Sequence, residues 1–264
     1  MIIDIHAHIY PDKIASKAVQ AIGTFYQIPM IGGGTKQTLL HNAREAGINI
    51  TCVSSVATVK EQVKTINRYI LSEITGNPEL RGFITLHPDQ SPAEIESEIS
   101  FAKQNGFLGI KLHPDFQRFR IDGPQAEEIF KRAENFRVLL HTGDKRYDFS
   151  SPPQLIKTAK KHKSVQFHAS HFGGYSEWEK LDGYIDTPNV CFDTSSSLAF
   201  LSVDTARGLI QKFGADRFMF GSDFPMWNQK QELLRLFSLK LSQNDLDMIL
   251  YSTAEKFYGN LREI

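Results

Sequence analysis

The stretch IIDIHAHI, residues 2–9, alternates between apolar and polar side chains. Because successive side chains of a β-strand point to opposite faces, Ile5 and Ala7 lie on one face and Asp4, His6 and His8 lie on the other. The stretch is therefore predicted to be a strand with one apolar face. We expect its Asp-His-His face to serve a polar interior.

Short apolar runs of the same kind recur along the whole chain. Amphipathic stretches of helical period separate them, and the stretch at 92–106 begins with the start signal Ser91-Pro92 and stops at Gly106. Strands that alternate with helices form a parallel sheet. The further strand candidates lie at 48–55, 81–87, 107–113, 137–142, 164–170, 189–195 and 217–223.

Eight such units in 264 residues predict an α/β fold, a (β/α)8 TIM barrel that occupies residues 1–264 as a single domain. An open, doubly wound sheet is the alternative, although such a sheet rarely contains eight evenly spaced units. An extra helix is expected over about 242–258, and the least regular segment is expected at 23–34.

The composition restricts the class of partner. Lys plus Arg and Asp plus Glu each number 30, so no basic excess exists to neutralise the phosphates of a nucleic acid. No apolar run is long enough to span a membrane, and nothing resembles a signal peptide. Cys52 and Cys191 lie in apolar stretches, as buried thiols do. We expect a cytoplasmic protein with a small-molecule substrate and without a nucleic-acid or membrane partner.

Histidines gather at the predicted strand ends, where a barrel of this kind carries its active site. Strand 7 ends near Asp193 and strand 8 ends with Asp223. Two imidazoles from one strand face, a third imidazole and a carboxylate form a ligand set for a divalent ion such as zinc. The histidines at or near strand ends are His6, His8, His87, His113, His141, His168 and His171.

Four motifs, DIHAH at 4–8, LLHTG at 139–143, HFGG at 171–174 and FGSDFP at 220–225, together resemble the amidohydrolase superfamily. The resemblance is to the amidohydrolase-related branch that includes aminocarboxymuconate-semialdehyde decarboxylase, where dimers are common. It implies a single divalent metal, zinc favoured over manganese, on His6, His8, His141 and Asp223. It also implies catalytic roles for Asp223 and His171, and a supporting role for Asp4 behind a histidine ligand.

Two assignments stay open at this point. Lys111 lies where some binuclear members of the superfamily carry a carboxylated lysine, so Lys111 and His171 could hold a second metal or contact the substrate. The period of strand 6 favours His168 as the inward residue, whereas the HFGG motif favours His171. We favour His171, because Gly173 and Gly174 fix a turn directly after it.

The loops after the strands are expected to select the substrate. His113, Arg146, Tyr147 and Trp227 would suit a small, carboxylate-bearing molecule that is cyclic or contains an ester or amide. The leading interpretation is a metal-dependent hydrolase that acts through a metal-activated water. A metal-dependent non-oxidative decarboxylase is the first alternative, and a non-catalytic metal-binding barrel is the second.

Overall fold

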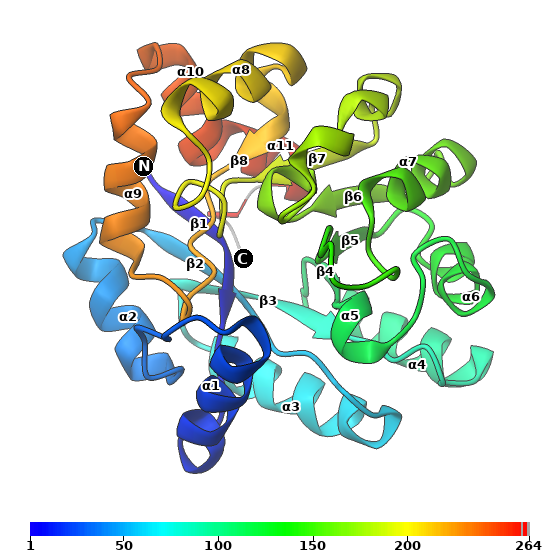
Figure 1. Cartoon of the computed structure of the whole chain (residues 1–264). Coiled ribbons are helices and arrows are strands. Elements are labelled where there is room, and N and C mark those ends of the chain that lie inside the picture. The colour runs from blue at the N-terminus through cyan, green and yellow to red at the C-terminus, as the bar shows by residue number, and fades with distance from the viewer. Residues whose placement is uncertain (260, 263–264) are drawn as a thin grey trace. The chain divides into compact units, whose positions relative to one another are not determined.

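The computed structural model describes residues 1–259 and 261–262 (Figure 1). Within them, eight strands form a parallel sheet in which they follow one another in chain order. All eight predicted strands are confirmed, each within its expected range apart from one residue at the start of β3. The strands are β1 (Ile3–His8), β2 (Ile50–Ser54), β3 (Leu80–Thr85), β4 (Gly109–Leu112), β5 (Arg137–Leu140), β6 (Gln166–Ala169), β7 (Val190–Asp193) and β8 (Phe218–Met219).

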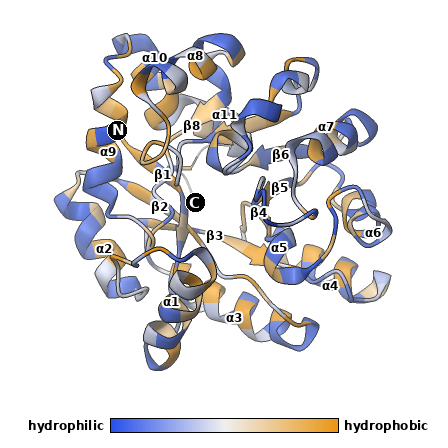
Figure 2. Ribbon diagram, viewed as in Figure 1, coloured by the Kyte–Doolittle hydropathy of each residue, from blue (hydrophilic) through white to orange (hydrophobic). Residues whose placement is uncertain are grey.

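Helices alternate with these strands, as the predicted (β/α)8 barrel requires. In Figure 2, these helices carry both hydrophobic and hydrophilic residues. Strands such as β3 are mostly hydrophobic. This difference is expected where amphipathic helices cover a buried sheet. The main helices are α1 (Asp12–Tyr26), α2 (Lys36–Glu45), α3 (Val63–Ile74), α4 (Pro92–Gln104), α6 (Pro124–Arg132), α7 (Pro152–Lys161), α8 (Val203–Phe213) and α9 (Gln229–Ser238).

The predicted helix boundaries hold where local signals were strong. Before α4, the Ser91 hydroxyl accepts the Glu94 backbone N–H, while the Glu94 carboxylate accepts the Ser91 backbone N–H at 2.7 Å. This reciprocal capping explains why the helix begins at Pro92.

The expectation for 23–34 is partly wrong, because α1 continues through Gly23 to Tyr26.

The chain ends in the expected additional helix. It consists of α10 (Gln243–Asp247), the π-helical turn η6 (Met248–Ser252) and α11 (Thr253–Tyr258), which together cover nearly all of the predicted 242–258. The Ile249 carbonyl in η6 accepts the Phe220 backbone N–H at 2.8 Å. The helix is thereby bonded to the segment that follows β8.

Two compact units make up the structure. The first comprises residues 1–54, 73–81 and 194–264, and the second comprises 55–72 and 82–193. In the first unit, the Ile5 N–H donates to the Phe220 carbonyl and the His8 N–H donates to the Phe224 carbonyl. These bonds join the first strand to the segment after the last, as barrel closure requires.

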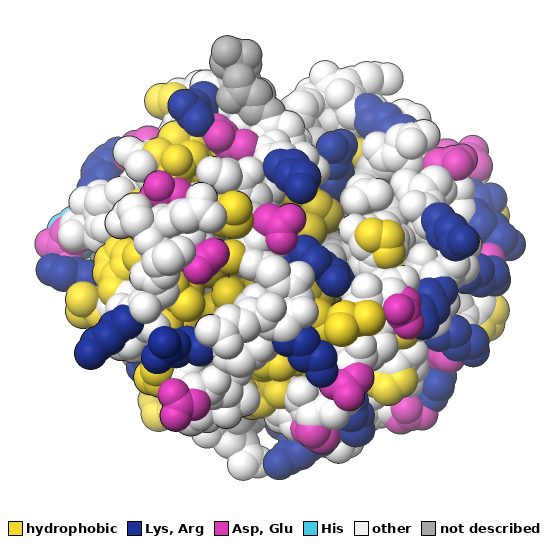
Figure 3. Space-filling view, turned by 90° about the horizontal axis from the view of Figure 1, so that it is seen from above, with side chains coloured by type: hydrophobic (Ala, Val, Ile, Leu, Met, Phe, Trp, Pro, Cys, Tyr) yellow, Lys and Arg dark blue, Asp and Glu magenta, His cyan; other side chains and the backbone are white. Residues whose placement is uncertain are grey.

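The surface carries both signs of charge. Figure 3 shows basic and acidic side chains interspersed over one face, in agreement with the balanced composition. Among the described residues, no helix is both long and apolar enough to cross a membrane. Cys52 and Cys191 form no disulfide, and Cys52 is buried as predicted, whereas Cys191 is only partly buried.

Candidate functional site

Three of the predicted ligands come together in the first unit. The His6 and His8 Nε2 atoms lie 3.2 Å apart, and the Asp223 Oδ1 atom lies 3.6 Å from the first and 3.2 Å from the second. Both histidines project from the same face of β1, and Asp223 follows β8. The period-two pattern of the first strand therefore produces the convergence that it predicted.

The triangle has the size of a metal-ligand set. Ligand atoms about 2.0–2.1 Å from a tetrahedral zinc ion lie roughly 3.3 Å from one another. The three distances between the His6, His8 and Asp223 atoms scatter closely around that value. Two imidazole nitrogens and one carboxylate oxygen suit zinc or manganese, so the donor set fits a divalent ion of this kind.

The outer nitrogen of each ligand histidine lies against a hydroxyl group. His6 Nδ1 lies 3.1 Å from Ser195 Oγ, and His8 Nδ1 lies 3.0 Å from Ser54 Oγ. A hydroxyl that accepts the Nδ1 proton leaves Nε2 with its lone pair, as a metal ligand requires. Neither serine was predicted from the sequence, although Ser54 ends β2 and Ser195 lies two residues after β7.

Asp4 supports the site through the backbone. Its carboxylate accepts the backbone N–H groups of Ser222 and His6, the Ser222 hydroxyl and the Gln229 side-chain amide. Burial raises the pKa of Asp4 to about 6, although these hydrogen bonds oppose the shift. Asp4 thus holds β1 to the segment after β8, whereas the expectation was that it would orient a ligand histidine directly.

Trp227, expected to contact the substrate, is partly buried, and three neighbouring side chains contact its indole group. Its Nε1–H donates to Ser196 Oγ at 2.9 Å, and the Arg235 guanidinium lies 4.9 Å from the centre of its ring. The Phe200 ring packs edge-on at 5.8 Å. These contacts fix the indole next to Asp223, because Ser196 also bonds that carboxylate.

A second histidine group lies in the second unit. His141 Nε2 lies 3.0 Å from the Gly143 carbonyl, which can only accept, so Nε2 carries the proton. His141 Nδ1 therefore presents a lone pair, and His171 Nε2 lies 2.9 Å from it. The structure thus places two of the predicted functional histidines in direct contact.

The turn after β6 brings His171 to this position. His171, Phe172 and Gly173 all have positive φ angles, of 62°, 54° and 77°. A Cβ atom at Gly173 would lie 2.9 Å from the Phe192 ring, so only glycine fits there without a shift of that ring. The HFGG motif therefore encodes the turn, as predicted.

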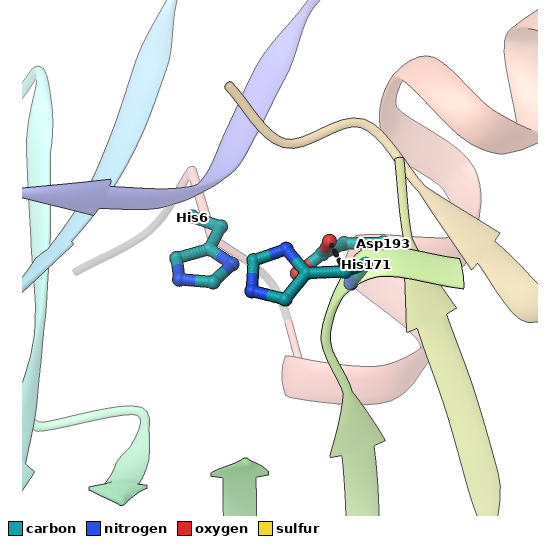
Figure 4. A group of neighbouring side chains, drawn as sticks. All are labelled: His6, His171 and Asp193. Carbon is teal, nitrogen blue, oxygen red and sulfur yellow. Dashed lines mark hydrogen bonds between the residues drawn. The ribbon is translucent and has the colours of Figure 1, made fainter. Parts of the chain in front are cut away.

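Asp193 joins both histidines of this segment. The His171 backbone N–H donates to Asp193 Oδ1 at 2.9 Å, as drawn in Figure 4. His168 Nε2 lies 2.9 Å from Asp193 Oδ2, and burial lowers the pKa of His168 despite that partner. His168 is thus a buried partner of Asp193, and the side chain that reaches His141 belongs to His171.

His113 caps the short helix α5 (Pro114–Gln117). Its Nδ1 accepts the Phe116 N–H at 3.3 Å, while its own backbone N–H donates to Gln117 Oε1 at 3.0 Å. The imidazole stacks on His141, with ring centres 4.0 Å apart. In the neutral ring, an accepting Nδ1 leaves the proton on Nε2.

The same arrangement occurs one strand earlier, where LHPDQ at 86–90 echoes LHPDFQ at 112–117. His87 Nδ1 accepts the Asp89 backbone N–H at 3.2 Å, and the His87 backbone N–H donates to Gln90 Oε1 at 2.8 Å. The echo between the two motifs is therefore a repeated turn that fixes each imidazole as an Nε2–H donor.

Asp115 is a buried acid beside His141. Its Oδ2 accepts the Ser150 hydroxyl at 2.7 Å and lies 3.7 Å from His141 Nε2. Burial raises the pKa of Asp115 to about 7, and the nearby charge of Asp144 adds to the shift. Asp115 was not among the site residues predicted from the sequence.

The remaining predicted residues of the second unit differ in exposure. Lys111 is almost fully buried on β4. The Arg146 guanidinium binds Asp144 through two nitrogens, Nε at 2.9 Å and Nη2 at 2.6 Å, and lies 5.3 Å from the centre of the exposed Tyr147 ring. Asp144 thus positions Arg146 as a fixed cation, a property that suits a carboxylate-binding residue.

Comparison with protein families gives a match over almost the whole chain. The family model described as amidohydrolase matches residues 3–260. Its span covers the first strand, both histidine groups and the C-terminal helix. Among curated proteins, none matches the chain.

Solved structures share the fold at low sequence identity. A TIM-barrel protein from Bordetella bronchiseptica aligns over 98% of this chain and 99% of its own, at 15% identity and a TM-score of 0.79. A manganese-bound dihydroxybenzoic acid decarboxylase from Polaromonas sp. JS666 aligns over 97% and 96%, at 16% identity and 0.73. A candidate 2-pyrone-4,6-dicarboxylic acid hydrolase from Pseudomonas putida aligns over 100% and 98%, at 18% identity and 0.69. These likenesses confirm the predicted barrel fold.

Proposed function

The chain belongs to the amidohydrolase family, and from this premise we propose that it is a metal-dependent hydrolase of a small, carboxylate-bearing substrate. The convergence of His6, His8 and Asp223 at 3.2–3.6 Å carries the proposal. A divalent ion bound there would lower the pKa of a water molecule and polarise a substrate carbonyl.

The family resemblance adds His141 as the fourth ligand. In the second unit, the bond from His141 Nε2 to the Gly143 carbonyl supports this, because it leaves the Nδ1 lone pair for a ligand role. Zinc is our first choice and manganese our second, with one ion per chain. A carboxylated Lys111, together with His171, is the alternative that would add a second ion.

The chain's own residues supply the rest of the chemistry. Asp223, whose carboxylate lies against both ligand histidines, would accept a proton during attack on the substrate. His171 would stabilise the negative charge that develops on the substrate, with its backbone N–H tied to Asp193. Arg146, fixed by Asp144, and His113 would bind the substrate carboxylate.

Non-oxidative decarboxylation is the second candidate. The manganese-bound structure from Polaromonas is described as a dihydroxybenzoic acid decarboxylase, and it shares the fold over almost its full length. The same residues would serve that reaction, with His171 delivering a proton to the carbon that loses CO2. The two reactions differ in what is released, so a single assay separates them.

The test begins with purified protein loaded with Zn2+ or Mn2+ and dialysed. We expect about one equivalent per chain, lost in His6→Ala and kept in the matched control His41→Ala, whose side chain is exposed. The loaded protein is then incubated with lactones, amides and aromatic carboxylic acids while acid production and CO2 are followed. CO2 from an acid would refute the hydrolase proposal, and full metal content in His6→Ala would refute the site.

A further inference from the structure

A short chain of hydrogen bonds ends on the carboxylate of Asp223. The Trp227 indole N–H donates to Ser196 Oγ at 2.9 Å, and Ser196 Oγ donates to Asp223 Oδ2 at 2.5 Å. All three residues belong to the first unit, and Ser196 is 1% exposed. Ser196 was not among the site residues predicted from the sequence.

The direction of these bonds follows from the groups themselves. An indole nitrogen can only donate, so the Ser196 oxygen must accept from Trp227. The single hydroxyl proton of Ser196 is then available for the acceptor at the shorter distance, which is Asp223 Oδ2. The only other contact of this hydroxyl in the described residues is the weak acceptor Met226 Sδ, at 3.3 Å.

The two carboxylate oxygens of Asp223 are thereby made different. Oδ2 receives the Ser196 proton, whereas Oδ1 lies 3.2 Å from His8 Nε2 and 3.6 Å from His6 Nε2. The backbone keeps both partners in place, because Ser196 and Asp223 have positive φ angles of 47° and 58°. Few side chains adopt that conformation without a local reason.

We propose that Ser196, fixed by Trp227, is a positioning residue that makes Asp223 a ligand through Oδ1 alone. The inference rests on the proposed function, since it requires an ion at His6, His8 and Asp223. It gives Trp227 a positioning role, where the sequence predicted substrate contact. It also gives a reason for the run TSSS at 194–197, which directly follows β7.

The test uses the full chain and Co2+ as the probe, because the visible absorption of this ion reports its coordination geometry. Ser196→Ala should weaken Co2+ binding by about 10- to 100-fold, the loss usual for an outer partner of a metal ligand. Its absorption spectrum should also change, because Asp223 is free to turn. Trp227→Phe, which leaves the serine hydroxyl free to rotate, should lose affinity to a smaller extent.

Two further variants separate positioning from folding. Ser196→Gly removes the same hydroxyl, but glycine adopts the positive φ angle at this position without steric cost. This variant should therefore bind Co2+ as weakly as Ser196→Ala does and unfold at a higher temperature than Ser196→Ala. Ser197→Ala is the matched control, because that buried hydroxyl donates to the Ser195 carbonyl at 2.9 Å and, among the described residues, has no hydrogen bond to His6, His8 or Asp223.

The outcomes distinguish this inference from the function on which it rests. If wild type binds Co2+ and Ser196→Gly binds it equally well with the same spectrum, the positioning role is wrong and the metal site stands. Equal loss in Ser197→Ala would likewise overturn the positioning role. If wild type does not bind Co2+, both the proposed metal site and the role of Ser196 are refuted.

Discussion

Each compact unit contains one group of two histidines and an aspartate, and the two groups differ in the partners of their ring nitrogens. His6, His8 and Asp223 form one group, and His113, Asp115 and His141 form the other. In each, one ligand-type atom from every residue lies within 4.8 Å of the others. Composition and proximity alone therefore do not distinguish the two groups.

The partners of the outer ring atoms make the difference. Ser54 and Ser195 lie against Nδ1 of His8 and His6, and a hydroxyl that accepts the Nδ1 proton leaves each Nε2 with a lone pair on the side of Asp223. In the second group, His113 Nδ1 accepts a backbone N–H, so its Nε2 carries a proton and cannot bind a cation.

His141 completes the contrast. Its Nε2 donates to the Gly143 carbonyl, so its only lone pair is on Nδ1, which faces His171 rather than Asp115. The second group is therefore a hydrogen-bonding unit around a buried acid. A ring nitrogen becomes a metal ligand only when its partner nitrogen has an acceptor to hold the proton.

Removal of a ligand histidine should have the largest effect. His6→Ala or His8→Ala should lower zinc affinity by more than the roughly 10- to 100-fold typical of outer partners. Wild type should gain about 2.7 kcal/mol of stability when free zinc is about 100 times its dissociation constant, and these variants should gain almost none. Calorimetric melting temperatures with and without zinc measure this difference.

His113→Ala is the matched variant in the second group. It should keep its zinc content and its stabilisation by zinc, because the imidazole that it removes carries its proton on Nε2 and is no zinc ligand. If His113→Ala lost zinc and His8→Ala kept it, the second group and not the first would be the zinc site.

Glu232 should give the next largest effect, through pH. Burial raises the pKa of this carboxyl, which lies in α9 of the first unit, from the ordinary 4.5 to about 7. The negative charges of Asp223 and Asp4 also raise the pKa, whereas the ion pair with Arg235 lowers it. Between these values the folded chain binds more protons than the unfolded chain, so the free energy of unfolding falls as pH rises. The fall amounts to roughly 3 kcal/mol at most.

Glu232→Gln should remove that part of the pH dependence. Urea unfolding at pH 5, 6, 7 and 8 measures the slope, with wild type as the reference and metal removed from both. An unchanged slope in Glu232→Gln would show that the first unit does not hold a protonated acid at this position.

Gly143→Ala should give a smaller loss of stability. Gly143 has a φ of 83°, and a Cβ atom there would lie 2.5 Å from the Gly174 carbonyl carbon. The left-handed conformation alone costs an alanine about 1–2 kcal/mol. The bond to His141 Nε2 would also be disturbed, so the second group should lose its alignment.

Gly208→Ala is the control for this variant. Gly208 lies in α8, and a methyl group added to it would meet no atom within 4 Å outside its own helix turn. Alanine also favours helices over glycine by roughly 0.5–1 kcal/mol. Urea unfolding should therefore show opposite signs for the two substitutions. The same sign for both would show that the turn after β5 tolerates a side chain.

The fold could be predicted because its signals are local and repeated. Each strand is a short apolar run, and caps such as Ser91 with Glu94 mark where a helix starts. The end of α1 could not be placed as well, because Gly23 reads as a breaker although the helix continues past it. A single glycine costs a helix little when the turns on both sides continue.

The site was predictable where one strand supplies two ligands in register, as β1 does with His6 and His8. Its supporting groups were not, because they depend on contacts between distant segments. Ser195 lies 189 positions from its partner His6, and Ser196 lies 27 positions from its partner Asp223. A run of hydroxyl residues directly after a buried strand was the available signal.

The most direct test of the comparison is a zinc titration of protein labelled with 15N in its histidine rings. We predict that zinc moves the Nε2 resonances of His6 and His8, while His113 keeps a protonated Nε2 and does not respond. A zinc response at His113, with His6 and His8 unchanged, would contradict the account.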